Sequence, residues 1–148
     1  MYQPTNTHIL VPEFDYEQPA TLEEVFSLLS EHGAGARLIA GGTDLLVQMK
    51  LEQESPVCLI GLDRVEELQG IAFDEGLVMG ATTSIRSLAA SEPIRRRCTA
   101  LVEACESFST TPIMIMGTLG GNLCNASPAA DTAPALLAFD ATVTIAST

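Results

Sequence analysis

Short apolar runs alternate with polar segments in the first part of the chain, in an order that predicts strand, helix, strand. The run "HILVPEF", His8–Phe14, predicts a short strand. "TLEE", Thr21–Glu24, has the form of a capping box and opens a helix whose apolar stripe ends before Gly33, the expected left-handed cap. Ala36–Ala40 then predicts a compact buried strand. This order favours a parallel pair of strands joined by a crossover.

The segments that follow complete a first lobe, for which we expect the boundaries 1–68. Leu45–Lys50 predicts a short helix that begins at the preceding Thr or Asp. Pro56–Leu62 is a third strand candidate, and Asp63–Leu68 predicts a turn or short helix. The fold class expected for this lobe is α/β, built around a small parallel sheet.

The remainder, 69–148, has a different pattern and predicts a second lobe with an antiparallel sheet and helices. Gly70–Gly80 reads as two short strands around an Asp-Glu-Gly turn. One or two helices should follow, with Pro93 as the break. The segment 111–121 is expected to be extended or looped.

The last part of the chain predicts one more helix and one more strand. Asp131–Phe139 should be a helix with Asp131 at its cap and Pro134 in its first turn. Ala141–Thr148 alternates as a half-buried strand does. Because a domain rarely ends on an unpaired apolar strand, we expect the chain to be the N-terminal portion of a longer polypeptide and the second lobe to be incomplete.

Composition narrows the classes of partner. Hydrophobic residues make up 47% of the 148 residues, which is enough for a folded core. Nineteen acidic residues against seven Lys and Arg give a formal net charge of -12, which argues against nucleic acid and anionic membrane as partners. No apolar run is long enough to cross a membrane, and the N-terminus lacks the features of a signal peptide, so we expect a cytoplasmic protein.

The sequence leaves two interpretations open for the cysteines and two for a run of arginines. Cys58, Cys98, Cys105 and Cys124 form no CxxC pair and have no histidine close by, which argues against a zinc or iron–sulfur site. Reduced, mostly buried thiols are favoured, and ordinary disulfides are the alternative. The triplet Arg95–Arg97 is either a docking patch for a partner or a solvated face that balances nearby acids.

Two glycine pairs, Gly41–Gly42 and Gly120–Gly121, are the candidate ligand-binding segments. Such pairs let successive backbone amides converge on an anion, which an acidic protein with few basic residues would need. Neither loop has the lysine of a P-loop or the spacing of a Rossmann turn. We therefore expect the two loops to form one site for a phosphate-bearing cofactor. A plain tight turn is the alternative for each loop, and a mononucleotide or CoA is the alternative ligand.

Two further residues have both a structural and a functional interpretation. Asp131 is expected as a helix N-cap, and its carboxylate could instead accept hydrogen bonds from ribose hydroxyls. Phe108 fits either the core or a cofactor contact.

The segments "LIAGGTDLLVQMK" and "GTLGGNLCNASPAADTAPALLAFDATV" closely resemble the FAD-binding medium subunit of the molybdenum hydroxylases. That family includes xanthine dehydrogenase, the aerobic carbon monoxide dehydrogenase and 4-hydroxybenzoyl-CoA reductase. The similarity covers nearly the whole chain. It implies a two-lobed FAD-binding fold with FAD in the cleft between the lobes. It also implies an electron-relay role, with a molybdopterin-binding large subunit and a [2Fe–2S] small subunit as partners.

The resemblance assigns cofactor contacts to this chain and neither a catalytic residue nor a metal ligand. The first pyrophosphate loop runs from Leu38 to Leu45, and the second corresponds to Thr118–Asn122, with Asp131 near the adenosine part and Ser127 and Cys124 near cofactor positions. The implied cofactor-binding residues are Leu38, Ile39, Ala40, Gly41, Gly42, Thr43, Asp44, Leu45, Phe108, Thr118, Gly120, Gly121, Asn122, Ser127 and Asp131.

The chain departs from the family in two respects. Pro112-Ile113-Met114-Ile115 stands where the family commonly has Gln-Ile-Arg-Asn, which removes a basic and an amide side chain. Family members also continue for roughly as many residues again. The resemblance implies that most of the residues that cover the flavin ring lie in that additional part. We therefore expect this chain alone to bind FAD weakly or not at all. A non-catalytic homologue or assembly module that keeps the fold without FAD is the alternative function.

Overall fold

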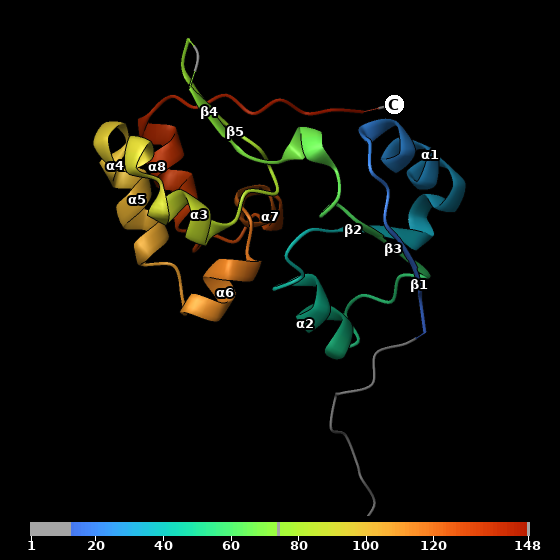
Figure 1. Ribbon diagram of the computed structural model, residues 1–148. Helices are drawn as coiled ribbons and strands as arrows, with labels where there is room; N and C mark the ends of the chain where they lie inside the picture. The colour runs from blue at the N-terminus through green and yellow to red at the C-terminus, as the bar shows by residue number, and fades with distance from the viewer. Residues whose placement is uncertain (1–12, 74, 148) are drawn as a thin grey trace, which may run out of the picture.

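The computed structural model describes residues 13–73 and 75–147, which form two lobes side by side (Figure 1). The first lobe contains a parallel sheet of three strands, covered by the helix α1, Leu22–His32. The strands are β1, Asp15–Glu17, β2, Ala36–Ile39, and β3, Cys58–Gly61. Their order is β1-β3-β2, and both neighbours pair with β3 in parallel. The predicted parallel sheet is confirmed, but direct pairing of the first two strands is wrong, because the wholly buried β3 lies between them.

The capping box predicted for α1 is present. Thr21 Oγ1 accepts a hydrogen bond from the amide of Glu24 at 3.2 Å. The Glu24 carboxylate reaches back to the amide of Ala20 at 2.7 Å, one residue before the expected partner. Gly33, with φ of 51°, ends the helix and begins a 3-10 turn, η1, Gly33–Gly35. Local hydrogen bonding at both ends therefore determines the length of α1.

Two short elements complete the first lobe as predicted. They are α2, Leu45–Lys50, and the 3-10 turn η2, Glu66–Leu68. The core of this lobe consists of Val25, Ala36, Cys58, Ile60 and Val65, all buried. The second lobe has a separate core, formed mainly by its helices. Each lobe therefore packs around its own group of apolar side chains.

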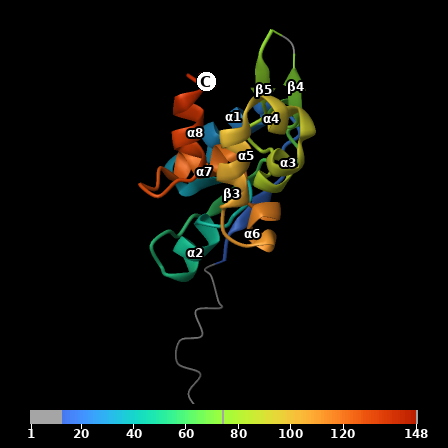
Figure 2. The same cartoon turned by 90° about the vertical axis from the view of Figure 1, so that its left-hand side faces the viewer.

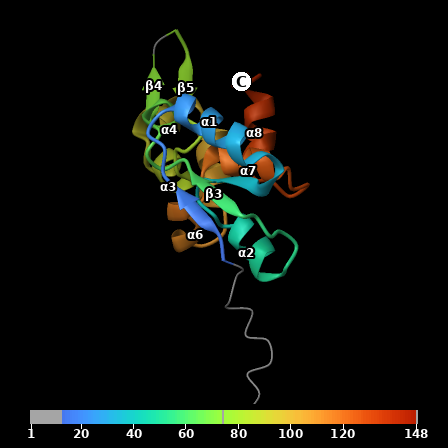
Figure 3. The ribbon, with the colours of Figure 1, turned by 90° about the vertical axis from the view of Figure 1, so that its right-hand side faces the viewer.

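The second lobe begins with the predicted hairpin. β4, Ile71–Phe73, and β5, Leu77–Met79, pair in antiparallel fashion and project from the body of the molecule (Figure 2). The helices that follow are α3, Ile85–Ala90; α4, Glu92–Arg97; α5, Thr99–Glu106; α6, Thr111–Met116; α7, Leu119–Asn125; and α8, Thr132–Ala138. Figure 3 shows the opposite side, where the parallel sheet with α1 and α2 faces the viewer.

The predicted break between helices is present, but it lies at Ser91, two residues before Pro93. Pro93 lies in the first turn of α4, where the missing N–H costs no hydrogen bond. The chain instead leaves helical geometry at Ser91 and at Cys98, so three helices occupy the segment that predicted one or two.

The extended segment expected over 111–121 is also wrong, because it contains α6 and the start of α7. Pro112 stands in the first turn of α6, a position where proline is favourable. Gly120 and Gly121 lie within the first turn of α7, although glycine disfavours helix by about 1 kcal/mol per residue relative to alanine. The Thr118 side chain caps this helix by accepting from the amide of Gly121 at 3.1 Å.

Neither terminal strand prediction is confirmed. Most of His8–Phe14 lies outside the described residues, and Glu13 and Phe14 precede β1, which starts where the amide of Asp15 donates to Val57 O. Residues 141–147 are exposed and form no strand, and no strand in the described parts of the chain pairs with them. They run from α8 across the molecule toward the side on which α1 lies (Figure 1).

The arginine triplet lies at the end of α4, and each of its members contacts a group of the same lobe. Arg95 pairs with Glu106 at 2.6 Å and Arg96 with Glu92 at 2.9 Å. The Arg97 guanidinium lies 5.0 Å from the ring centre of Phe73 in β4. These contacts favour the interpretation of the triplet as a solvated face.

Candidate functional site

The two glycine pairs meet at one cavity of about 310 Å³ between the lobes. The first pair directly contacts the segment that precedes the second pair, because a Cβ added to Gly41 would lie 1.9 Å from the backbone oxygen of Met116. All but two of the sequence-predicted site residues line this cavity: Leu38, Ile39, Ala40, Gly41, Gly42, Thr43, Asp44, Leu45, Phe108, Thr118, Gly120, Gly121 and Asn122. The volume is at the lower limit of usual small-molecule pockets.

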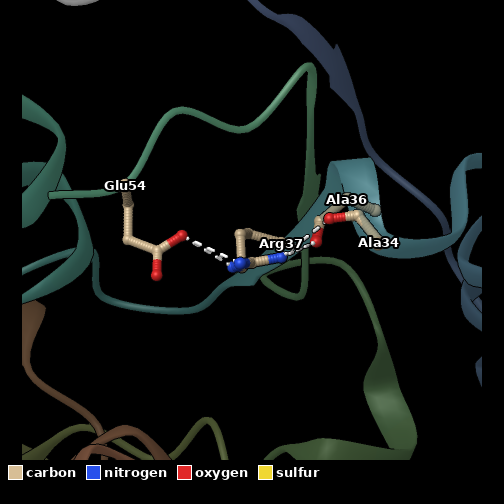
Figure 4. A network of polar contacts seen from close by, with 4 residues as sticks. All are labelled: Ala34, Ala36, Arg37 and Glu54. Atoms are coloured by element: carbon tan, nitrogen blue, oxygen red, sulfur yellow. Dashed lines mark hydrogen bonds and ion pairs between the residues drawn. The ribbon is translucent and has the colours of Figure 1, made fainter. Parts of the chain in front are cut away.

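Hydrogen bonds hold the first loop, residues 40–44, from both of its ends. β2 leads into it, and Ile39 O accepts from the amide of Leu62 at 2.9 Å. Arg37 of β2 forms a salt bridge of 2.9 Å with Glu54, in the segment that leaves α2, and donates to Ala36 O at 2.9 Å (Figure 4). The strand before the loop and the chain after α2 are therefore tied together.

The first loop offers backbone donors to the cavity. Within the described residues, the amides of 41–45 have no hydrogen-bond acceptor. Gly42 has φ of 69°, a left-handed conformation that favours glycine, and this conformation turns the chain into α2. Successive free amides of this kind form a concave site for an anion.

The second glycine pair has no free amides, contrary to the expectation that amides of both pairs converge on the ligand. The amide of Gly120 donates to Ala81 O at 2.8 Å, and that of Gly121 donates to the Thr118 side chain. The neighbouring amide of Leu119 donates to Thr83 O at 3.0 Å. A Cβ on Gly120 would lie 2.8 Å from both Ala81 Cβ and Ala81 O, so glycine here allows two backbone segments to approach closely.

Asn122 of the second segment lines the cavity and carries a side-chain donor. Its side-chain oxygen accepts a hydrogen bond from the hydroxyl of Thr132 at 2.5 Å. No acceptor for its Nδ2 is found in the described parts of the chain. The Asn122 side chain therefore adds a neutral N–H donor to those of the first loop.

Asp44 is the charged residue that lines the cavity, and no Lys or Arg lines it among the described residues. Asn125 Nδ2 donates to Asp44 Oδ1 at 3.0 Å, and the Thr43 hydroxyl donates to Asp44 Oδ2 at 3.3 Å. Asp44 occupies the N-cap position of α2 but makes no side-chain cap bond. Two neutral donors thus engage the carboxylate beside the free amides.

Ser127 and Asp131 are the two predicted site residues that do not line the cavity. The Ser127 hydroxyl accepts from the amide of Ala129 at 3.2 Å. Asp131 holds the N-cap position of α8 but makes no side-chain cap bond. Their assignment to a cofactor therefore stays a prediction.

Six residues that line the cavity were not predicted from the sequence: Gln48, Leu62, Ala81, Thr82, Gly117 and Asn125. Helical spacing would have indicated two of them, because Gln48 is four residues after Asp44 and Asn125 is three after Asn122. Ala81 and Thr82 have no such signal. They reach the site because the segment 81–85 hydrogen-bonds along 117–120.

The four thiols are free, and only their surroundings differ. Cys124 is exposed and lines the cavity, whereas Cys58 and Cys105 are buried. Burial, with Asp131 and Glu106 adding repulsion, raises the pKa of Cys105 to about 11. The pKa of Cys58 is raised as well, again mainly by burial. Buried thiols of this kind remain protonated and unreactive at neutral pH.

The described residues hold no group of three or more His, Cys, Asp or Glu side chains suited to a metal ion. Among the helices in that part of the chain, none is both long and apolar enough to span a membrane.

Comparison with known proteins places this geometry among flavin-binding subunits. Residues 12–148 match the family described as the FAD binding domain in molybdopterin dehydrogenase. The carbon monoxide dehydrogenase medium chain of Hydrogenophaga pseudoflava is 35% identical over 125 residues, 83% of this chain and 43% of that protein. The xanthine dehydrogenase FAD-binding subunit of Escherichia coli O157:H7 is 34% identical over 132 residues, 88% of this chain and 45% of that subunit.

Solved structures of related enzymes contain chains with the same fold. A chain of the carbon monoxide dehydrogenase from Hydrogenophaga pseudoflava, in a form lacking the Mo-pyranopterin moiety of its cofactor, superposes with a TM-score of 0.78 at 34% identity, over 81% of this chain and 42% of that one. A chain of quinoline 2-oxidoreductase from Pseudomonas putida 86 superposes with a TM-score of 0.80 at 30% identity. The match covers 84% of this chain and 44% of that one. The present chain thus spans less than half the length of the relatives it matches.

Proposed function

Because this chain belongs to the family of FAD-binding domains in molybdopterin dehydrogenases, we propose that it is the FAD-binding part of an electron-transfer subunit in a molybdenum-containing hydroxylase or dehydrogenase. Its cofactor is FAD, which supplies the redox chemistry when bound. Electrons would pass between iron–sulfur clusters of partner subunits and an external acceptor. The chain itself contributes binding and orientation of the flavin cofactor.

One observation carries this proposal: both glycine pairs line the same cavity, and the first offers a run of free amides there. A diphosphate needs several N–H donors around it, and Asn122 supplies one more from the second lobe. The residues present therefore fit a dinucleotide, even though no basic side chain among the described residues lines the cavity. Backbone dipoles can hold such a ligand in a protein whose net charge is -12.

We propose the predicted lobes, 1–68 and 69–148, as the two units that enclose the cofactor. Two separate apolar cores support this division, one around Val25 and Ile60 and the other around Leu88 and Leu101. The residues that line the cavity are proposed as cofactor contacts, with Ser127 and Asp131 as additional contacts in the complete site.

The proposed partners are a molybdopterin-binding large subunit and a [2Fe–2S] small subunit. Medium chains and FAD subunits of dehydrogenases among the relatives support this proposal. A cytoplasmic location is proposed as well, since four free thiols suit a reducing compartment.

Co-expression with the genes that adjoin its own tests the function. A FAD subunit should co-purify with its partners as a yellow-brown complex that shows flavin absorption. A colourless complex of the same composition would instead favour the non-catalytic assembly module.

A second measurement addresses the chain by itself. Titration of the isolated chain with FAD, followed by fluorescence quenching, should reveal weak binding at most, because the chain spans less than half of its relatives. A sub-micromolar affinity would contradict that expectation. Competition by ADP, by a mononucleotide and by CoA distinguishes the three ligand classes.

A further inference from the structure

We propose that Thr132 is a positioning residue, which orients the Asn122 amide so that its NH2 group, and not its oxygen, faces the cavity. The inference rests on the proposed function, because it concerns how the site receives an anionic ligand. Thr132 is the first residue of α8 and is fully buried, and its hydroxyl lies 2.5 Å from Asn122 Oδ1.

The orientation of Asn122 follows from the hydrogen of the Thr132 hydroxyl. An asparagine amide can turn by half a rotation, and a hydroxyl can donate to its oxygen or accept from its nitrogen. If the NH2 group pointed at Thr132, the hydroxyl hydrogen would need another acceptor. Asn122 Oδ1 is its acceptor in the described parts of the chain. A buried hydroxyl without an acceptor is disfavoured by a factor between about 5 and 150, so the observed orientation prevails.

The orientation decides what the cavity offers to a phosphate. With the oxygen held by Thr132, Asn122 presents a donor beside the free amides of 41–45. The opposite orientation would present a carbonyl oxygen, which repels an anionic ligand. The number of N–H donors that the cavity offers thus depends on the hydroxyl of Thr132, a residue that does not itself line the cavity.

The position of Thr132 is itself fixed by packing. Ala135 and Leu136, on the next turn of α8, are buried in the core of the second lobe. Asn122 is on α7, and α7 contacts α8. The core therefore holds the hydroxyl in place.

The test compares Thr132→Val, which keeps the shape of the side chain without its hydroxyl, with Thr132→Ser, which keeps the hydroxyl. We expect T132V to weaken FAD binding about tenfold, measured by titration of the complex co-expressed with its partners, because the isolated chain is expected to bind FAD weakly or not at all. T132S should stay within about threefold of the wild type. In the Asn122→Ala background, T132V should cause no further loss. Wild-type affinity in T132V, or an equal loss in both backgrounds, would overturn the proposal.

A second measurement does not need the cofactor. The 13C shift of the Asn122 side-chain carbonyl in the free chain should change in T132V and be retained in T132S, because the hydrogen bond to its oxygen is lost only in the former. An unchanged shift in T132V overturns the inference. Absence of FAD binding by every variant and by the assembled complex, with the shift change present, would instead count against the proposed function.

Discussion

Asn125 Nδ2 donates a hydrogen bond to Asp44 Oδ1 across 3.0 Å, although 81 residues separate the two in the chain. Asn125 ends α7 in the second lobe, and Asp44 stands immediately before α2 in the first. The bond therefore connects the lobes at the cavity and engages the Asp44 carboxylate, which lines it.

Replacing this donor by Asn125→Ala should weaken FAD binding about threefold to tenfold, because the Asp44 carboxylate loses a compensating donor beside an anionic ligand. The unfolding free energy should fall by less than about 1 kcal/mol, since both side chains are exposed. NMR titration with FAD and urea unfolding measure the two effects. Gln53→Ala, an exposed amide away from the cavity, is the control. An affinity equal to that of the wild type would show that Asp44 does not need Asn125.

The contact between the lobes predicts a strong effect of Gly41→Ala. The new methyl group would lie 1.9 Å from Met116 O, a backbone atom, so the loops must separate. We expect a loss of about 3 kcal/mol in unfolding free energy, measured in urea, and loss of FAD binding. Gly76→Ala is a matched control, because nothing lies within 4 Å of its added Cβ. Equal stability of the two variants would contradict the close approach.

The two glycines of α7 should respond differently to alanine. Gly120→Ala places a methyl group 2.8 Å from Ala81 Cβ and Ala81 O, and should cost about 1–3 kcal/mol in thermal or urea unfolding. Gly121→Ala meets only the Thr118 side chain, and the gain in helix propensity of about 1 kcal/mol offsets the weakened cap. If Gly121→Ala were the more damaging of the two, the second pair would not serve backbone packing as described.

Cysteine labelling reports on the occupancy of the cavity. Cys124 is exposed and lines the cavity, so it should react with iodoacetamide faster than buried Cys58 and Cys105. In the complex co-expressed with its partners, saturation with FAD should slow this reaction, as followed by mass spectrometry of the labelled peptides. In Cys124→Ser the fast phase should disappear. A fast phase that persists with its rate unchanged by FAD would place the ligand elsewhere.

The raised pKa of Cys105 predicts a loss of stability at alkaline pH. Its pKa rises from the ordinary value of 9.0 to about 11 in the folded chain, so folding favours the protonated thiol. That contribution is complete below pH 9 and is lost as the pH rises from about 9 toward 11. In this window the wild type should lose up to about 1.4 kcal/mol more per pH unit than Cys105→Ala. Urea unfolding of both proteins at several pH values measures the difference, and parallel pH profiles would contradict it.

Local sequence patterns determined those elements whose hydrogen bonds join residues only a few positions apart in the chain. Thr21 and Glu24 specify the start of α1 through hydrogen bonds that span a few residues, and the turn between β4 and β5 follows from short-range chemistry. The two glycine pairs predicted that their loops share one site, and the resemblance to the family predicted most of the residues that line it. Glycine-rich segments marked the places where backbone must come close, either to a ligand or to another segment.

Only the tertiary structure decided which of those two roles each glycine pair has. Within the described residues, no other segment brings an acceptor within hydrogen-bond distance of the amides of 41–45, whereas Gly120 donates to Ala81, which lies 39 residues earlier in the chain. The same reason explains why 141–147 forms no strand and why β3 separates β1 from β2. A strand or a free amide depends on what lies beside it in space, and residues distant in the chain supply that neighbour.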